Sequence, residues 1–156
     1  MSRVKLHIPA DLPFYTQIPV RIEDINYGGH LGHDALVSIL QEARLHFLQK
    51  LDCSELDACG TGLIMGYLSV VYLQEGHYGD QLRIGIGVSE IQRSTVELCY
   101  AVSVTRSGNH VPLAEAITGL VCFDYARRKV QAVPSTLRNR LQPYLIAGNQ
   151  SKLDFS

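Results

Sequence analysis

The sequence predicts an α+β fold in which one curved antiparallel sheet wraps around a single long helix. Residues 33–51 carry apolar side chains at helical spacing, and the second half of the chain holds four runs with β character, separated by short links. No link is long enough for a helical crossover, so neighbouring runs are expected to pair antiparallel. One apolar helix then needs one sheet to cover it.

The first predicted element is a strand at residues 15–24, where β-branched and aromatic residues partly alternate with polar ones. Pro19 lies inside it and indicates an edge strand or a bulge, because proline cannot donate a backbone hydrogen bond. A helix of about five turns follows at 33–51. Its apolar stripe consists of Leu36, Leu40, Ala43 and Phe47, widened by Val37, Ile39 and Leu48.

The four β runs make up most of the second half of the chain and lie at 63–75, 81–92, 94–106 and 112–125. The links "GHYGD", "RS" and "SGNH" are interpreted as short turns between neighbouring antiparallel strands, which gives a long meander. Pro134 and Ser135 then begin a predicted short helix, because apolar residues follow at helical spacing. These are Leu137, Leu141 and Leu145.

Length and composition indicate one domain over residues 1–156, since 46% hydrophobic residues suffice for a buried core. The formal net charge of −1 leaves no broad basic face, so nucleic acid is not an expected partner. No stretch approaches the roughly 18 apolar residues of a membrane span, and the N-terminus lacks a secretory pattern. We therefore expect a cytoplasmic protein without membrane contact.

The cysteines and histidines give no sign of a metal site. Cys53, Cys59, Cys99 and Cys122 have the spacing neither of a zinc site nor of a secreted disulfide framework. We expect reduced, structural thiols, as is usual in the cytoplasm. The histidines also lack metal-ligand spacing, so no bound metal is expected.

A polar, glycine-rich segment, "EDINYGGHLGHDAL" at 23–36, directly precedes the predicted long helix. Its glycines allow sharp turns, and we expect them to leave backbone N–H groups uncovered. The first four N–H groups of a helix lack partners within the helix, and the helix dipole adds partial positive charge at that end. The segment is therefore a candidate binding site for a group with partial negative charge.

The order of elements and this segment together resemble the hotdog fold, in particular the branch of 4-hydroxybenzoyl-CoA and acyl-ACP thioesterases. "DINYGGHLGHDALVSILQEAR" is similar to that branch's Asp-x-(Asp/Asn)-x-x-Gly/Gln-His-(Val/Leu)-x-Asn segment and its following helix with Glu-Ala-Arg. The similarity continues in "YLQEGHYGDQLRI", "QRSTVELCYAV" and "AEAITGLVCFDYARRKVQAVP". It implies a thioester hydrolase whose subunits pair edge to edge into a homodimer or homotetramer.

The resemblance also implies residue roles. Backbone N–H groups around Gly29, His30 and Leu31 would receive the thioester carbonyl and stabilise the oxyanion. Many relatives have Asp where Asn26 stands; because Asn cannot take a proton, Asn26 would orient water or donate to the carbonyl. His30 matches a histidine of the acyl-ACP thioesterases and is the candidate that orients or deprotonates water.

Asp24 and Glu42 are the nearest carboxylates available as a general base. Both have a structural alternative, because Asp24 can end a strand or cap a turn and Glu42 can belong to a solvated helix face. Asn26 can likewise support a tight turn. His33 and Asp34 lie where helix caps are usual, and we expect them to cap the helix.

Three arginines in predicted turns can hold the phosphates of CoA or simply be solvated: Arg93, Arg127 and Arg128. We expect hydrolysis of acyl-CoA, or of acyl-ACP, to a carboxylic acid and a free thiol, with CoA only as part of the substrate and no other cofactor. Two alternatives stay open. One is a hotdog module that binds an acyl thioester without cleaving it, which Asn26 favours; the other is a hydratase or dehydratase of the same fold.

Overall fold

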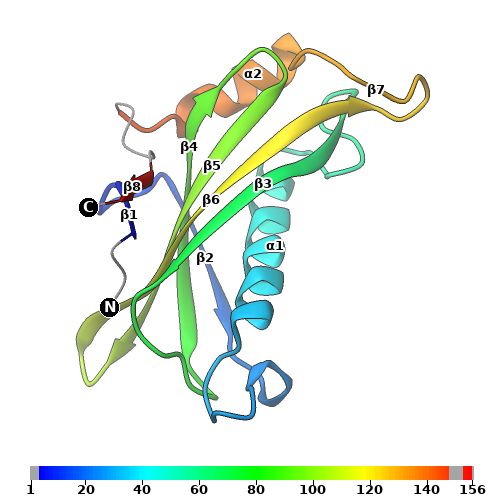
Figure 1. The fold of residues 1–156 in the computed structure, drawn as a ribbon. Coiled ribbons are helices and arrows are strands. Elements are labelled where there is room, and N and C mark those ends of the chain that lie inside the picture. Colours follow the sequence, from blue (N-terminus) through cyan, green and yellow to red (C-terminus); the bar gives the residue numbers. More distant parts are fainter. Residues whose placement is uncertain (1–3, 148–152, 156) are drawn as a thin grey trace.

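The computed structural model of the protein describes residues 4–147 and 153–155. Figure 1 shows a strongly curved antiparallel sheet with one long helix, α1 (His33–Lys50), along one side of it. The order of strands across the sheet is β2 (Phe14–Pro19), β4 (Gln81–Ile91), β5 (Thr95–Arg106), β6 (Asn109–Asp124) and β3 (Gly62–Tyr72), with the short β7 (Lys129–Val130) also paired to β6. The predicted fold class is confirmed.

The remaining elements are short and lie outside this sheet. A short 3₁₀ helix, η1 (Ile22–Asp24), precedes α1, and α2 (Ser135–Leu141) with a second 3₁₀ helix, η2 (Gln142–Tyr144), follows the sheet. β1 (Val4–Leu6) and β8 (Leu153–Phe155) form a separate two-stranded pair, which the sequence did not indicate. In the described ranges, no helix has both the length and the apolar character needed to cross a membrane.

Helix α1 packs its predicted stripe into the core. Leu36, Leu40, Ala43 and Phe47 are all buried, and the Phe47 ring meets the Phe14 ring of β2 at 5.3 Å between centroids. Burial of a Leu or Phe side chain contributes about 1.5–3 kcal/mol. The stripe therefore fixes α1 against the sheet, and its bounds differ by one residue from those predicted.

The predicted meander is correct for β4, β5 and β6 and wrong for β3. β3 lies at the sheet edge beside β6, with Tyr72 opposite Ala114, and makes no ladder with β4. The link "GHYGD" thus belongs to a connection, residues 73–80, that crosses from one side of the sheet to the other. Its eight residues can span about 26 Å, whereas three strand spacings need only about 14 Å.

The first strand is shorter than predicted. β2 ends at Pro19, and the last residues of the predicted strand form η1 instead. The Asp24 carboxylate accepts a hydrogen bond from the backbone N–H of Arg21 at 2.8 Å, which closes this turn. Asp24 therefore stabilises a turn and does not end a strand.

Among the residues that the structure describes, no strand pairs with the outer edge of β3. The strand carries large apolar side chains that are partly exposed. Its register against β6 shifts between Met65 and Tyr67, where a bulge lies. The exposed apolar residues of this strand are Ile64, Met65, Tyr67, Leu68 and Tyr72. An apolar open edge of this kind is usually covered by another chain or segment.

Candidate functional site

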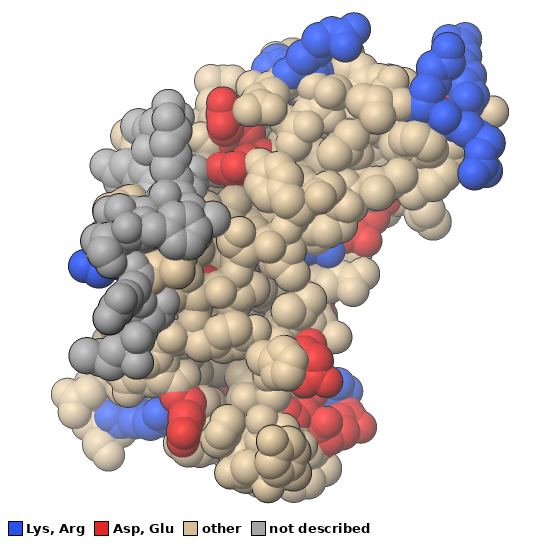
Figure 2. Space-filling view, viewed as in Figure 1, with Lys and Arg blue, Asp and Glu red and all other residues tan. Residues whose placement is uncertain are grey.

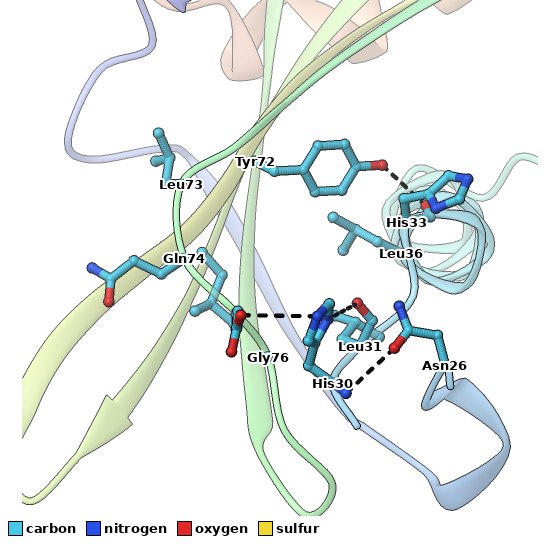
Figure 3. A pocket seen from close by; sticks show the side chains of 11 residues that line it. Asn26, His30, Leu31, His33, Leu36, Tyr72, Leu73, Gln74 and Gly76 are labelled. Carbon is cyan, nitrogen blue, oxygen red and sulfur yellow. Dashed lines mark hydrogen bonds and ion pairs between the residues drawn. The ribbon is translucent and has the colours of Figure 1, made fainter. Parts of the chain in front are cut away.

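A cavity of about 350 Å³ lies where the segment before α1 meets the connection after β3 (Figure 3). Three parts of the chain contribute to it: the glycine-rich segment with the first turn of α1, the end of β3 with its connection, and β6. The lining residues are Asn26, His30, Leu31, His33, Leu36, Tyr72, Leu73, Gln74, Glu75, Gly76 and Leu113. The polar segment singled out in the sequence thus forms one wall.

Asn26 organises the turn that this segment makes. Its Oδ1 accepts hydrogen bonds from the N–H of Gly28 at 2.9 Å and of His30 at 3.5 Å, and its own N–H donates to the His30 carbonyl at 2.9 Å. Gly29 adopts φ +84°, which favours glycine. The Asn26 oxygen therefore supports the turn, while its side-chain nitrogen points toward the start of α1 (Figure 3).

His30 faces Glu75 across the cavity. The His30 Nε2 and Glu75 Oε1 atoms lie 3.8 Å apart, and His30 Nδ1 lies 3.4 Å from the Leu31 carbonyl oxygen (Figure 3). A proton on Nδ1 donated to that carbonyl leaves the lone pair of neutral imidazole on Nε2, beside the carboxylate. The geometry suits a histidine that takes a proton and is stabilised by a neighbouring negative charge.

Glu75 was missed by the sequence analysis because it lies 45 positions after His30, at the end of a predicted strand. Arg106 on β5 holds the backbone of Glu75 in place. The Arg106 Nη2 atom donates to the Glu75 carbonyl at 2.9 Å and to Asp80 Oδ2 at 2.6 Å. An acidic residue directly before a glycine-containing link is the signal that would have drawn attention to it.

The backbone N–H groups expected to be uncovered are occupied. Gly29 N–H donates to the Asn26 carbonyl at 3.0 Å and Leu31 N–H donates to the Gly76 carbonyl at 2.8 Å. The expectation for Gly29, His30 and Leu31 is therefore wrong, because the turn and the neighbouring connection satisfy these donors. The sequence could not show the second partner, which lies far along the chain.

Open N–H groups occur slightly later, in the first turn of α1. Gly32 occupies the N-cap and offers no side chain, and the first helical hydrogen bond runs from Leu36 N–H to the Gly32 carbonyl at 3.0 Å. Among the described residues, no acceptor is found for the N–H groups of His33, Asp34 and Ala35. His33 lines the cavity, so the donors of this helix end lie beside it. The cap predicted at His33 and Asp34 is thus at Gly32.

The structure does not bring the two predicted carboxylates to His30. Asp24 is buried in η1, where it bonds the Arg21 N–H, and it does not line the cavity. Glu42 lies on the exposed side of α1, with His46 Nε2 3.9 Å from its Oε1. Asp24 therefore lies in a turn and Glu42 on a solvated helix face, which are the structural alternatives given for them above.

The three predicted phosphate-binding arginines lie at the far end of the sheet from this cavity. Arg93 is in the β4–β5 turn, and Arg127 and Arg128 are in the turn after β6. The cavity end of β3 is marked by Tyr72, opposite Ala114, whereas Gly62 at its other end is opposite Phe123, near the basic turn. Figure 2 shows Lys and Arg side chains gathered where β6 passes into β7. Within one chain, these arginines do not meet the cavity.

Comparison with known proteins gives a consistent picture. A sequence model described as "Thioesterase-like superfamily" matches residues 20–141. No curated protein sequence is significantly similar to this chain. Several solved structures share the fold, which confirms the hotdog architecture expected from the sequence.

Three of these structures illustrate the likeness. A thioesterase-superfamily protein from a Jannaschia species has a TM-score of 0.77 at 19% identity, over 90% of this chain and 89% of that one. A thioesterase from Thermus thermophilus, complexed with coenzyme A and Zn, has 0.74 at 20% identity, over 86% and 95%. A 1,4-dihydroxy-2-naphthoyl-CoA thioesterase from Synechocystis has 0.69 at 18% identity, over 83% and 95%.

Proposed function

Because this chain belongs to the thioesterase-like superfamily, we propose that it is a hydrolase that cleaves acyl-CoA to a carboxylic acid and free CoA. The observation that carries the proposal is the meeting, in one cavity, of His30, Glu75 and the open first turn of α1. We place the protein in the cytoplasm, where free thiols such as its four cysteines persist.

In the proposed reaction, the thioester carbonyl oxygen lies at the first turn of α1 and accepts hydrogen bonds from its open N–H groups. Charge that develops on this oxygen is stabilised by those donors and by the helix dipole. Water held at His30 Nε2 attacks the carbonyl carbon and gives its proton to the imidazole, whose positive charge Glu75 offsets. The C–S bond then breaks, and the proton passes to the leaving thiolate.

The other predicted residues take supporting roles in this proposal. Asn26 keeps the turn that places His30, and its side-chain nitrogen can donate to the water or the carbonyl. Gly29 permits that turn, and Leu31 supplies apolar surface beside the acyl group. No metal or redox cofactor takes part, so we expect turnover to be unchanged by a chelator.

We further propose that two copies pair through the open edges of β3. Two identical edges related by a two-fold axis pair antiparallel, so the cavity end of one strand meets the far end of the other. That arrangement brings Arg93, Arg127 and Arg128 of a second copy toward the cavity, where they can hold the phosphates of CoA. It also covers the exposed apolar side chains of β3. A tetramer would be two such dimers.

A panel of acyl-CoA and acyl-ACP thioesters tests the function, with release of free thiol as the readout and an enzyme-only reaction as the blank. Thiol release with catalytic turnover supports the hydrolase. Binding without release supports the alternative of a non-hydrolytic module. This alternative is favoured by the hydrogen bond that the Asn26 oxygen accepts within its turn. Addition of water to an enoyl thioester would instead identify a hydratase.

A further inference from the structure

The connection from α1 to β3, residues 51–61, carries two cysteines whose sulfur atoms are in contact (Figure 1). The Sγ atoms of Cys53 and Cys59 lie 3.7 Å apart, and both side chains are half-buried. Cys99 and Cys122 are instead fully buried in the sheet. Among the described residues, no further His, Cys, Asp or Glu completes a metal site with the two thiols. The connection therefore holds two neighbouring thiols that solvent can reach.

Hydrogen bonds within this connection fix the position of the two thiols. The Cys53 N–H donates to the Leu48 carbonyl of α1 at 2.9 Å. The Ser54 N–H donates to the Asp57 carbonyl at 3.0 Å, and the Asp57 N–H donates to Ser54 Oγ at 3.0 Å. The Gly60 N–H donates to Asp57 Oδ1 at 2.9 Å. Because the backbone is held in this way, the second thiol is already in place when the first one reacts.

Cys59 adopts a backbone conformation that residues with a side chain rarely occupy. Its φ of +59° lies in the left-handed region, and Gly60 follows it with φ +94°. Glycine or asparagine is usual at such a position, because a Cβ makes it less favourable. A cysteine held there in contact with a second thiol indicates a role for its side chain.

Arg140 of α2 places a positive charge beside Cys53. Its Nη1 atom donates to Cys53 Sγ at 3.8 Å and to the Leu51 carbonyl at 3.0 Å, which holds it at this connection. Burial raises the pKa of the Cys53 thiol and contact with Cys59 adds to this effect, whereas Arg140 acts to lower the pKa. At neutral pH Cys53 is therefore mainly protonated, and Arg140 stabilises the thiolate once it forms.

We propose that Cys53 and Cys59 form a reversible disulfide in the presence of a small disulfide such as oxidised glutathione. The Cys53 thiolate attacks one glutathione sulfur, the S–S bond of glutathione breaks, and one glutathione leaves as a thiolate. Cys59 then loses its proton to solvent, attacks the Cys53 sulfur and displaces the second glutathione. The two cysteines are thereby oxidised, and one glutathione disulfide is reduced to two thiols.

The new bond would tie the end of α1 to the start of β3. A disulfide of about 2.05 Å requires the two sulfur atoms, now 3.7 Å apart, to approach by about 1.7 Å. The closed loop contains Glu55, whose Oε1 accepts a hydrogen bond from Arg44 Nε at 2.7 Å and whose carbonyl accepts one from the Leu63 N–H at 2.7 Å. Because the bond restricts the unfolded chain, oxidation should raise the midpoint of thermal unfolding by about 5 °C.

The test treats the folded protein with oxidised glutathione and follows its free thiols and its intact mass. We expect two of the four thiols to disappear at least about tenfold faster than the other two, since buried thiols are inert. The product should lack two hydrogens and carry no glutathione, and a peptide map should link residues 53 and 59. Dithiothreitol should restore both thiols and the original midpoint.

Cys59→Ser removes the thiol that displaces glutathione and should leave one glutathione bound to Cys53. Cys99→Ala is the matched control, because it keeps the pair and should be oxidised as the parent protein is. No loss of thiols, glutathione retained on the parent protein, or a bond to another cysteine or another chain would overturn the inference. An unchanged or lower midpoint after oxidation would also overturn it, since the bond would then form only by distorting the connection. These measurements do not depend on the proposed hydrolase activity.

Discussion

The backbone N–H of Leu31 donates to the Gly76 carbonyl oxygen at 2.8 Å and joins the segment before α1 to the connection after β3. A Cβ on Gly76 would lie 3.0 Å from both Cβ and Cδ2 of Leu31. Gly76→Ala should therefore push the two segments apart and destabilise the fold by about 1–3 kcal/mol. The midpoint of thermal unfolding and the rate of thioester turnover should both decrease. An unchanged midpoint would show that the connection yields without strain.

His30→Ala tests the proposed base. Turnover should drop about a hundredfold or more, as expected when a general base is lost, while the thermal midpoint stays close to that of the parent protein because the side chain is only half-buried. His110→Ala is the control, since His110 is exposed at the start of β6. Equal turnover of the folded His30 variant and the control would remove His30 from the mechanism.

Variants of Asn26 separate the role of this side chain in the turn from its role in the reaction. Asn26→Asp keeps the acceptor that bonds Gly28 and places a carboxylate near the positive end of α1, so it should retain or raise activity at an unchanged midpoint. Asn26→Ala loses both functions and should lower activity and midpoint. Turnover and unfolding are measured together, with Asn26→Gly included. Full activity of the Ala and Gly variants, with only the midpoint lowered, would show that Asn26 is scaffold.

The sequence predicted α1 closely because a helix depends on local spacing, and the stripe from Leu36 to Phe47 determines which face is buried. It did not predict the place of β3, because a turn signal encodes a bend and not which strands become neighbours. The site shows the same limit. The turn at Asn26 is local and was recognised, whereas the contacts of His30 with Glu75 and of Leu31 with Gly76 each join positions 45 residues apart.

Light scattering at micromolar concentration tests the pairing of two copies. We expect twice the chain mass of 17.3 kDa or a multiple of that value. Ile64→Lys puts a charge on the open edge of β3 and should shift the protein toward monomer, since a charged side chain on an edge strand disfavours pairing with another chain. Ile22→Lys, at an exposed position in η1, is the control. A monomeric parent protein would contradict the proposed pairing.

Asp80 should make stability depend on acid pH. Partial burial acts to raise its pKa, but the Arg106 guanidinium and the His77 N–H lower the pKa below its usual value. A lowered pKa means that the pair stabilises the fold fully above the ordinary carboxyl pKa of about 4 and loses this as pH decreases below it. Asp80→Asn should therefore lower the free energy of unfolding by about 1 kcal/mol at neutral pH.

Denaturant unfolding of both proteins from pH 7 to pH 3 checks this expectation. The difference in the free energy of unfolding between the parent protein and Asp80→Asn should be constant down to about pH 5 and shrink at lower pH. A difference that does not change with pH would mean that the pair contributes no charge interaction. The same variant should also loosen the connection that carries Glu75, because Arg106 bonds both residues.

The place of β3 at the edge also has a consequence for how the chain folds. Gly62 pairs with Phe123 and Tyr72 with Ala114, residues far away in the sequence, whereas β4, β5 and β6 follow one another through tight links. Pairings between residues far apart in sequence form slowly, so β3 docks only after β6 has been synthesised and the three-strand meander exists. Until then the nascent chain exposes the apolar residues of β3. An incompletely folded chain without β3 would therefore keep most of its sheet but lack the wall of the cavity that Tyr72 and the following connection form.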